Sequence, residues 1–283
     1  MEAGIALQAL LFSTLALPAA EAGSAPKIPV NPLLADSFRL MYELKFDAAR
    51  ARLGDCRHAD PEDPLCAAAE AASHLFERFN QSGVLTSSFF LNDDLLLGGV
   101  TGVPDREHDA AFLKTNQRAR AMAETRLHLD SQNPGALLAL VLTDGMQGNY
   151  EALIAKRQME SLRFTRKAEI EARALLQVQP DNGDAYVALG VANYIIGCLP
   201  GYKRFLLWFG GYRGDRLAGM EQLQVAATRG LYLQPLAKTM LALVAEREHQ
   251  PDRARALFAD LNREFPANAV FAHELWLLQE RVP

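Results

Sequence analysis

Residues 178–190, VQPDNGDAYVALG, separate two helical patterns by only a few residues. Before this stretch, residues 168–178 place Ala, Leu and Val on one helix face at intervals of three and four. Pro180 cannot continue that helix, because its ring removes a backbone donor and clashes with the preceding turn. Asp181 and Asn182 suit a turn or the cap of a following helix. The stretch therefore predicts two consecutive helices joined tightly.

Gly190 is the unusual residue of the second predicted helix, whose face also carries Tyr186 and Leu189. A glycine inside a helix costs roughly 1 kcal/mol relative to alanine. We expect a neighbouring helix to approach closely at this position and so offset the cost.

The same pattern, a helix stop followed by an Asp or Asn, occurs four times along the chain. An Ala is followed twelve positions later by a helix stop, and an Asp or Asn stands two positions after that stop. The alanines are Ala49, Ala119, Ala168 and Ala254, the stops are Pro61, Ser131, Pro180 and Pro266, and the acidic or amide residues are Asp63, Asn133, Asn182 and Asn268. Because the four units are unequally spaced along the chain, the repeat is irregular and must be interrupted by insertions.

This pattern resembles the tetratricopeptide repeat (TPR), a helix–turn–helix unit of roughly 34 residues. The matching positions are Tyr186, Leu189 and Gly190 in one unit and Leu241, Ala242, Ala254, Phe258 and Pro266 in another, whereas Asn193 and Lys238 depart from it. The best units lie near 30–63, 165–196 and 235–268. The resemblance implies an all-α solenoid of antiparallel helix pairs, a TPR-like superhelix, with irregular insertions near 80–110 and 198–215.

Residues 198–223, CLPGYKRFLLWFGGYRGDRLAGMEQL, carry a second and narrower resemblance. Their Leu-Pro, aromatic-Gly, Gly-Asp-Arg and Gly-x-x-x-Leu elements are similar to a motif of tetratricopeptide proteins related to inclusion-body clearance factors. The physical interpretation is an inserted amphipathic helix over 202–209, followed by a helix that starts at Asp215 and Arg216. Trp208 and Phe209 would either pack inside the protein or form a ridge that contacts a partner or a membrane surface.

Composition and charge bound the class of protein. Hydrophobic residues make up 49% of the 283 residues, which is ample for a core, and charged residues make up 22%. The net charge of −5 argues against nucleic-acid binding, which needs a basic face to neutralise phosphates. We expect one helical repeat domain over residues 26–283.

Residues 1–25 have the shape of a secretory signal. The apolar run 5–17 is too short to span a bilayer and is followed by Ala20-Glu21-Ala22, although Glu2 stands where a basic residue is usual. We therefore expect a periplasmic or secreted protein without a membrane span, or a cytoplasmic one if residues 1–25 are not a signal.

Export would give the cysteines a role. Cys56 and Cys66 flank a predicted turn between helices and are candidates for a disulfide; the alternative is two buried thiols. Cys198 would remain unpaired.

Motifs that carry chemistry are missing from the sequence. The segment HELWL at 273–277 has Leu277 where a zinc helix needs its second His, and His74 lacks companion ligands. No nucleophile elbow, phosphate-binding loop or C-x-x-C is found. We expect no catalytic residue, no metal and no cofactor.

The leading hypothesis is an interaction scaffold that binds a protein or peptide in the concave groove of the solenoid. By the family resemblance, the groove would be lined by Asp184, Val187, Val191 and Tyr194 and, in the unit after Ser131, by Leu137, Val141 and Asp144. These side chains would favour a partner with apolar anchors and some basic character.

Three alternatives stay open. Terminal helices or the 198–212 insertion could fill the groove, or the arc could enclose an apolar pocket that carries a small molecule or lipid. An enzyme with its site dispersed over the insertions, especially 80–110, is the third alternative. The sequence does not indicate an oligomeric state.

Overall fold

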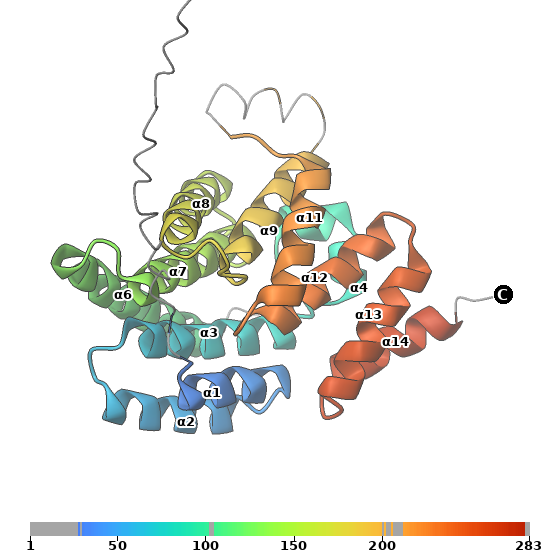
Figure 1. Cartoon of the computed structure of the whole chain (residues 1–283). Helices are drawn as coiled ribbons and strands as arrows, with labels where there is room; N and C mark the ends of the chain where they lie inside the picture. The colour runs from blue at the N-terminus through green and yellow to red at the C-terminus, as the bar shows by residue number, and fades with distance from the viewer. Residues whose placement is uncertain are drawn as a thin grey trace, which may run out of the picture.

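The computed structural model describes residues 28, 30–101, 105–199, 201, 205 and 212–280, and throughout these ranges every regular element is a helix (Figure 1). The predicted all-α class is therefore confirmed. The helices are α1 (Pro32–Tyr42), α2 (Phe46–Ala59), α3 (Pro64–Gln81), α4 (Ser87–Phe90), α5 (Asp93–Gly98), α6 (Arg106–Leu129), α7 (Pro134–Leu153), α8 (Gln158–Val178), α9 (Ala185–Cys198), α11 (Arg216–Arg229), α12 (Gln234–Arg247), α13 (Pro251–Glu264) and α14 (Ala269–Glu280).

The helices pack mainly as successive pairs. Contacts join α1 to α2, α3 to α6, α7 to α8, α9 to α11 and α12 to α13, and α14 packs on α13. The short helices α4 and α5 interrupt the second pair, and residues 199–215 interrupt the fourth. The fold is therefore a solenoid of helix pairs with insertions, and the unit predicted near 165–196 lies across the boundary between two pairs.

One turn geometry connects four of these pairs to the helix that follows. The backbone N–H of Asp63, Asn133, Asn182 and Asn268 donates to the carbonyl three residues earlier, over 3.0–3.3 Å. In each turn the side-chain oxygen of the same residue then accepts a backbone N–H in the first turn of the next helix. Because the first N–H groups of a helix have no partner within it, this bond stabilises the start of each of these four helices. The four predicted helix stops and the capping role of the Asp or Asn that follows each are confirmed.

The alanines of the repeat lie where helices cross. Ala49, Ala119, Ala168 and Ala254 are all buried. In the fourth pair a glycine, Gly219, takes the equivalent place, twelve positions before Leu231 in the turn that precedes α12. A Cβ at Gly190 would lie 2.8 Å from Leu223 Cγ and 3.0 Å from the Gly219 oxygen, so α9 and α11 approach closely, as the sequence predicted.

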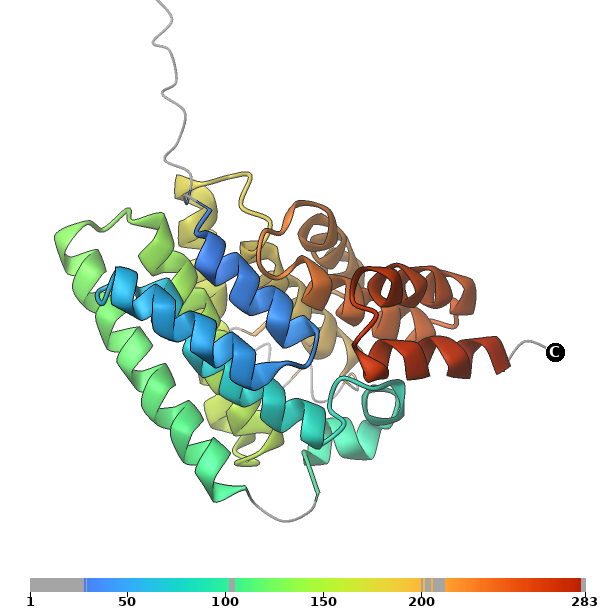
Figure 2. The ribbon, with the colours of Figure 1, turned by 90° about the horizontal axis from the view of Figure 1, so that it is seen from below.

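The solenoid closes on itself rather than remaining open. The Tyr42 hydroxyl at the end of α1 donates to the Tyr232 carbonyl over 3.1 Å, and Asn268 donates from its side-chain amide to the Tyr42 carbonyl over 2.8 Å. Figures 1 and 2 both show the blue N-terminal helix ending beside the red α14. The first and last pairs are therefore neighbours in space, although Tyr42 and Asn268 are 226 positions apart in the chain.

Gly219→Ala tests the close crossing of α9 and α11. Its Cβ would stand 2.6 Å from the Tyr194 nitrogen and 2.9 Å from the Gly190 oxygen, both backbone atoms that cannot step aside. We expect a loss of roughly 2 kcal/mol or more of unfolding free energy in a urea titration. The matched control is Gly145→Ala in α7, where a Cβ meets nothing within 4 Å and a gain of up to about 1 kcal/mol is expected. Equal effects at the two sites would contradict the crossing.

Candidate functional site

The residues predicted to line the concave groove lie mostly in the interior. Val191 is half-buried, and the other six are buried: Asp184, Val187, Tyr194, Leu137, Val141 and Asp144, each with 7% or less of its surface exposed. Side chains enclosed to this degree do not line an open surface. The prediction of an accessible groove along these positions is thus corrected.

Asp184 shows why such a residue is inside. Its carboxylate accepts the backbone N–H groups of Leu231, Tyr232 and Leu233 over 2.9–3.2 Å. These N–H groups belong to the turn before α12, which has no Asp or Asn of its own. Burial raises the pKa of Asp184, while the three N–H groups favour the charged form. The turn before α12 therefore takes its cap from Asp184, which lies in the turn before α9.

The other two polar residues of the predicted groove, Tyr194 and Asp144, also have partners within the protein. The Tyr194 hydroxyl donates to Glu248 Oε1 over 2.8 Å. Asp144 on α7 pairs through one carboxylate oxygen with Arg120 on α6, while its other oxygen is buried without a hydrogen bond. Burial raises the pKa of Asp144 to about 6, although Arg120 and Lys167 act in the opposite direction. These contacts hold helices together.

The insertion between α3 and α6 helps to close the inner face. Arg247 on α12 donates to the Phe90 carbonyl over 3.0 Å and pairs with Asp93. Glu274, in the HELWL segment of α14, accepts the Ser87 backbone N–H over 3.2 Å. These bonds tie the insertion to α12 and to α14, the helix that follows the turn in which Asn268 donates to the Tyr42 carbonyl.

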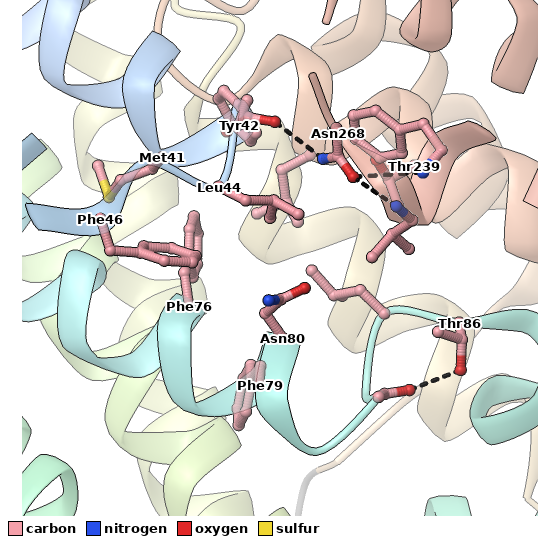
Figure 3. Close-up of a pocket in the computed structure, with 15 residues that line it drawn as sticks. Met41, Tyr42, Leu44, Phe46, Phe76, Phe79, Asn80, Thr86, Thr239 and Asn268 are labelled. Atoms are coloured by element: carbon pink, nitrogen blue, oxygen red, sulfur yellow. Dashed lines mark hydrogen bonds between the residues drawn. The ribbon is translucent and has the colours of Figure 1, made fainter. Parts of the chain in front are cut away.

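An open pocket lies between the two ends of the solenoid (Figure 3). Its volume is about 530 Å³, including its open mouth, and most of its lining is apolar. The lining residues are Met41, Tyr42, Leu44, Phe46, Phe76, Phe79, Asn80, Gly83, Leu85, Thr86, Leu236, Thr239, Asn268, Val270 and Phe271. The pocket lies where α1, α3, α12 and the start of α14 meet, and it is our candidate site.

The polar side chains of the pocket differ in whether they form hydrogen bonds within the protein. The hydroxyls of Thr86 and Thr239 donate to the carbonyls of Gly83 and Pro235. Asn268 caps α14 and binds the Tyr42 carbonyl, as the dashed lines of Figure 3 show. The Asn80 side chain, by contrast, has no hydrogen-bond partner within the part of the chain that the structure describes. It offers a free amide in an apolar surrounding.

The sequence patterns did not point to this pocket. Phe76 and Phe79 lie three residues apart on the last turns of α3, a spacing that only indicates one helix face. Leu236 and Val270 reach the same pocket from helices near the other end of the chain. A local pattern carries no information about such a meeting.

Three further predictions have a definite place in the structure. Cys56 and Cys66 have their Sγ atoms in bonding contact and their Cα atoms 6.1 Å apart, a separation that suits a disulfide. Cys198 is half-buried at the end of α9. Asp215 caps α11 by accepting two backbone N–H groups. Residues 1–25, Trp208 and Phe209 lie outside the described residues, so the signal and the ridge stay predictions.

The comparisons with known proteins concern the fold. No protein-family model and no curated protein matches the sequence. Among solved structures, the chain is similar to TTC0263, a thermophilic TPR protein of Thermus thermophilus, with 13% identity and a TM-score of 0.47 over 87% of this chain and 99% of that one. Likeness at this level says nothing about a site or a partner. None of the described helices has the length and apolar character needed to cross a membrane.

Asp184→Ala tests the shared cap. The substitution leaves three backbone N–H groups near the start of α12 without an acceptor, two of them in buried residues. We expect a loss on the order of 3 kcal/mol of unfolding free energy, measured by urea titration. Asp36→Ala on the exposed side of α1 is the control and should change stability little. A loss of less than about 1 kcal/mol in Asp184→Ala would contradict the shared cap.

Asp144→Asn tests the buried carboxylate through pH. Because the folded-state pKa of about 6 exceeds the ordinary value of 3.8, the folded protein binds this proton more tightly than the unfolded chain. Asp144 therefore destabilises the wild type above pH 6, and this cost disappears as the pH falls toward 4. The melting temperature of Asp144→Asn relative to wild type should be higher at pH 8 than at pH 4.5. A difference that does not change with pH contradicts the raised pKa.

Proposed function

We propose that this protein is a non-enzymatic helical-repeat adaptor that binds a polypeptide partner, with an apolar side chain of the partner in the pocket between α1, α3, α12 and α14. The observation that carries the proposal is the open apolar pocket that contains the free amide of Asn80. Solenoids of helix pairs characteristically serve as surfaces for other proteins. The site is a restricted part of the inner face rather than a continuous groove.

The apolar wall of the pocket suits an anchoring side chain. Leu44, Phe76, Leu85, Leu236 and Val270 are each half-buried, so part of their apolar surface remains in contact with water. Covering apolar surface contributes about 25 cal/mol per Å² removed from water. An aromatic or branched aliphatic residue would therefore be favoured over a charged one.

Asn80 favours a polypeptide over a plain hydrocarbon. A side-chain amide has both a donor and an acceptor, which match the carbonyl and N–H of a peptide group. A hydrocarbon that covered Asn80 would leave both groups unsatisfied, which costs about 1–3 kcal/mol. A peptide that crossed the mouth of the pocket would satisfy them.

A small-molecule carrier is the second candidate. Its support is the mostly apolar lining of the pocket, a character shared by sites that bind small apolar ligands. For the third hypothesis, an enzyme, the pocket gives no support: the one ionisable side chain in its lining is Tyr42, whose hydroxyl is engaged by Tyr232. Location in the cell envelope rests on residues 1–25 alone and is part of the proposal.

The proposal is tested by selecting peptides from a random library on the wild-type protein and measuring their affinity for variants. Leu236→Arg places a charge in the pocket and should weaken binding by about tenfold or more. Asn80→Ala should weaken it by several fold with no loss of helical content. Leu217→Arg, at a position 71% exposed on α11, is the matched control and should leave binding unchanged.

Selected peptides that share an apolar residue and lose affinity in Leu236→Arg support the adaptor. Peptides that bind Leu236→Arg and wild type equally would place the binding surface elsewhere and contradict the proposal. Native mass spectrometry of the purified protein distinguishes the carrier, which would retain an apolar small molecule that Leu236→Arg does not retain.

A further inference from the structure

The first turn of the solenoid gathers three potential metal ligands. Cys56 lies in the last turn of α2, Asp63 caps α3, and Cys66 lies in the first turn of α3. The two sulfurs and a carboxylate oxygen of Asp63 all lie within 4.8 Å of one another. Both cysteines are buried and Asp63 is half-buried, so the cluster is enclosed but can be reached from the side of the carboxylate.

The other three turns of the same geometry lack such a set. In place of Cys56 they have Arg126, Leu175 and Leu261; in place of Asp63 they have Asn133, Asn182 and Asn268; in place of Cys66 they have Ala136, Ala185 and Phe271. The repeated geometry therefore requires neither the thiols nor the carboxylate. The presence of two cysteines and an aspartate in this one turn therefore needs an explanation other than the turn geometry.

Capping does not explain the carboxylate. Asp63 Oδ1 accepts the Leu65 backbone N–H over 2.8 Å, a role that an Asn oxygen performs in the other three turns. The second oxygen, Oδ2, lies 3.1 Å from Cys66 Sγ. A disulfide sulfur has no proton to share with that oxygen. A thiol does have one, and a cation bound between the oxygen and the sulfur would be attractive to both.

Asn31 completes the surroundings of the sulfurs. Its side-chain oxygen accepts the N–H groups of Leu33 and Leu34 at the start of α1, which fixes the orientation of the amide. Its nitrogen consequently faces the sulfurs, 3.4 Å from Cys56 Sγ and 3.8 Å from Cys66 Sγ. An N–H donor beside a sulfur stabilises negative charge on it, as donors around metal-bound ligands commonly do.

We propose that the reduced form of this turn binds a thiophilic divalent cation such as Zn²⁺ through the thiolates of Cys56 and Cys66 and the carboxylate of Asp63. Two sulfurs and one oxygen are ligands that Zn²⁺ accepts, and three protein ligands leave a fourth position for water. Binding displaces the thiol protons, so affinity falls as the pH is lowered. In the disulfide form the sulfurs are no longer anionic, and the site is lost.

The site connects to the closure of the solenoid. Asn31, which faces the two sulfurs, also donates its backbone N–H to the Tyr232 hydroxyl over 3.4 Å. Disulfide and metal are alternative cross-links of the same turn, and either would join α2 to α3 beside the Asn31 amide. The redox state of the compartment decides which cross-link is present.

The test uses the whole chain with Cys198→Ser as background, so that Cys56 and Cys66 are the cysteines that remain. The reduced protein, kept under a phosphine reductant, is titrated with Co²⁺ and then with Zn²⁺. We expect one equivalent of Co²⁺ to give thiolate charge-transfer absorption, which Zn²⁺ then abolishes. Cys66→Ser should abolish the absorption. Asp63→Asn should weaken Co²⁺ affinity by about tenfold or more while leaving thermal stability without metal unchanged, because Asn retains the cap.

Three results would overturn the proposal. The first is a reduced protein that binds neither cation at micromolar concentration. The second is equal affinity in the oxidised and reduced proteins, which places the site elsewhere. The third is unchanged affinity in Asp63→Asn, which removes the carboxylate from the ligand set. Because Asp63→Asn preserves the capping oxygen, a folding defect does not obscure the last comparison.

Discussion

The structure depends on one constraint, the need to satisfy the backbone N–H groups at the start of each helix. Asp63, Asn133, Asn182 and Asn268 meet it with the same bond inside a turn of four residues. Because the turn is so short, each pair must pack against the next helix. The turn before α12 has no such residue, and its N–H groups donate to Asp184 in the turn before α9. The Asp184 carboxylate therefore links two helix pairs.

The second determinant of the structure is how the ends of the solenoid meet. Tyr42 contacts Tyr232 and Asn268, and the α4–α5 insertion is held by Arg247 and Glu274. An open arc would present its inner face to a partner over many residues. Here the residues predicted to line the inner face are mostly interior, and an apolar pocket lies beside Phe76 and Phe79. Under the proposed function, recognition at this site would concern an anchoring group rather than a long extended segment.

The contrast between Asp63 and its three Asn counterparts separates what the repeated turn requires from what it does not. When four turns share one geometry, the residues common to all of them are explained by the geometry. The residues that differ, Cys56, Asp63 and Cys66, are left for another explanation. The same comparison applied to Asp184 leads to a structural answer, because its partners are backbone N–H groups.

The sequence by itself determined the all-helical class, the four repeated helix stops with their caps, and the close crossing at Gly190, because these features depend on residues within one or two turns of each other. It also placed Cys56 and Cys66 on either side of one turn. It misjudged the groove, since the burial of Asp184, Tyr194 and Asp144 depends on helices that are distant in the chain. Only the tertiary structure decided where the pocket lies, because its walls come from both ends of the solenoid and no local spacing records that these ends meet.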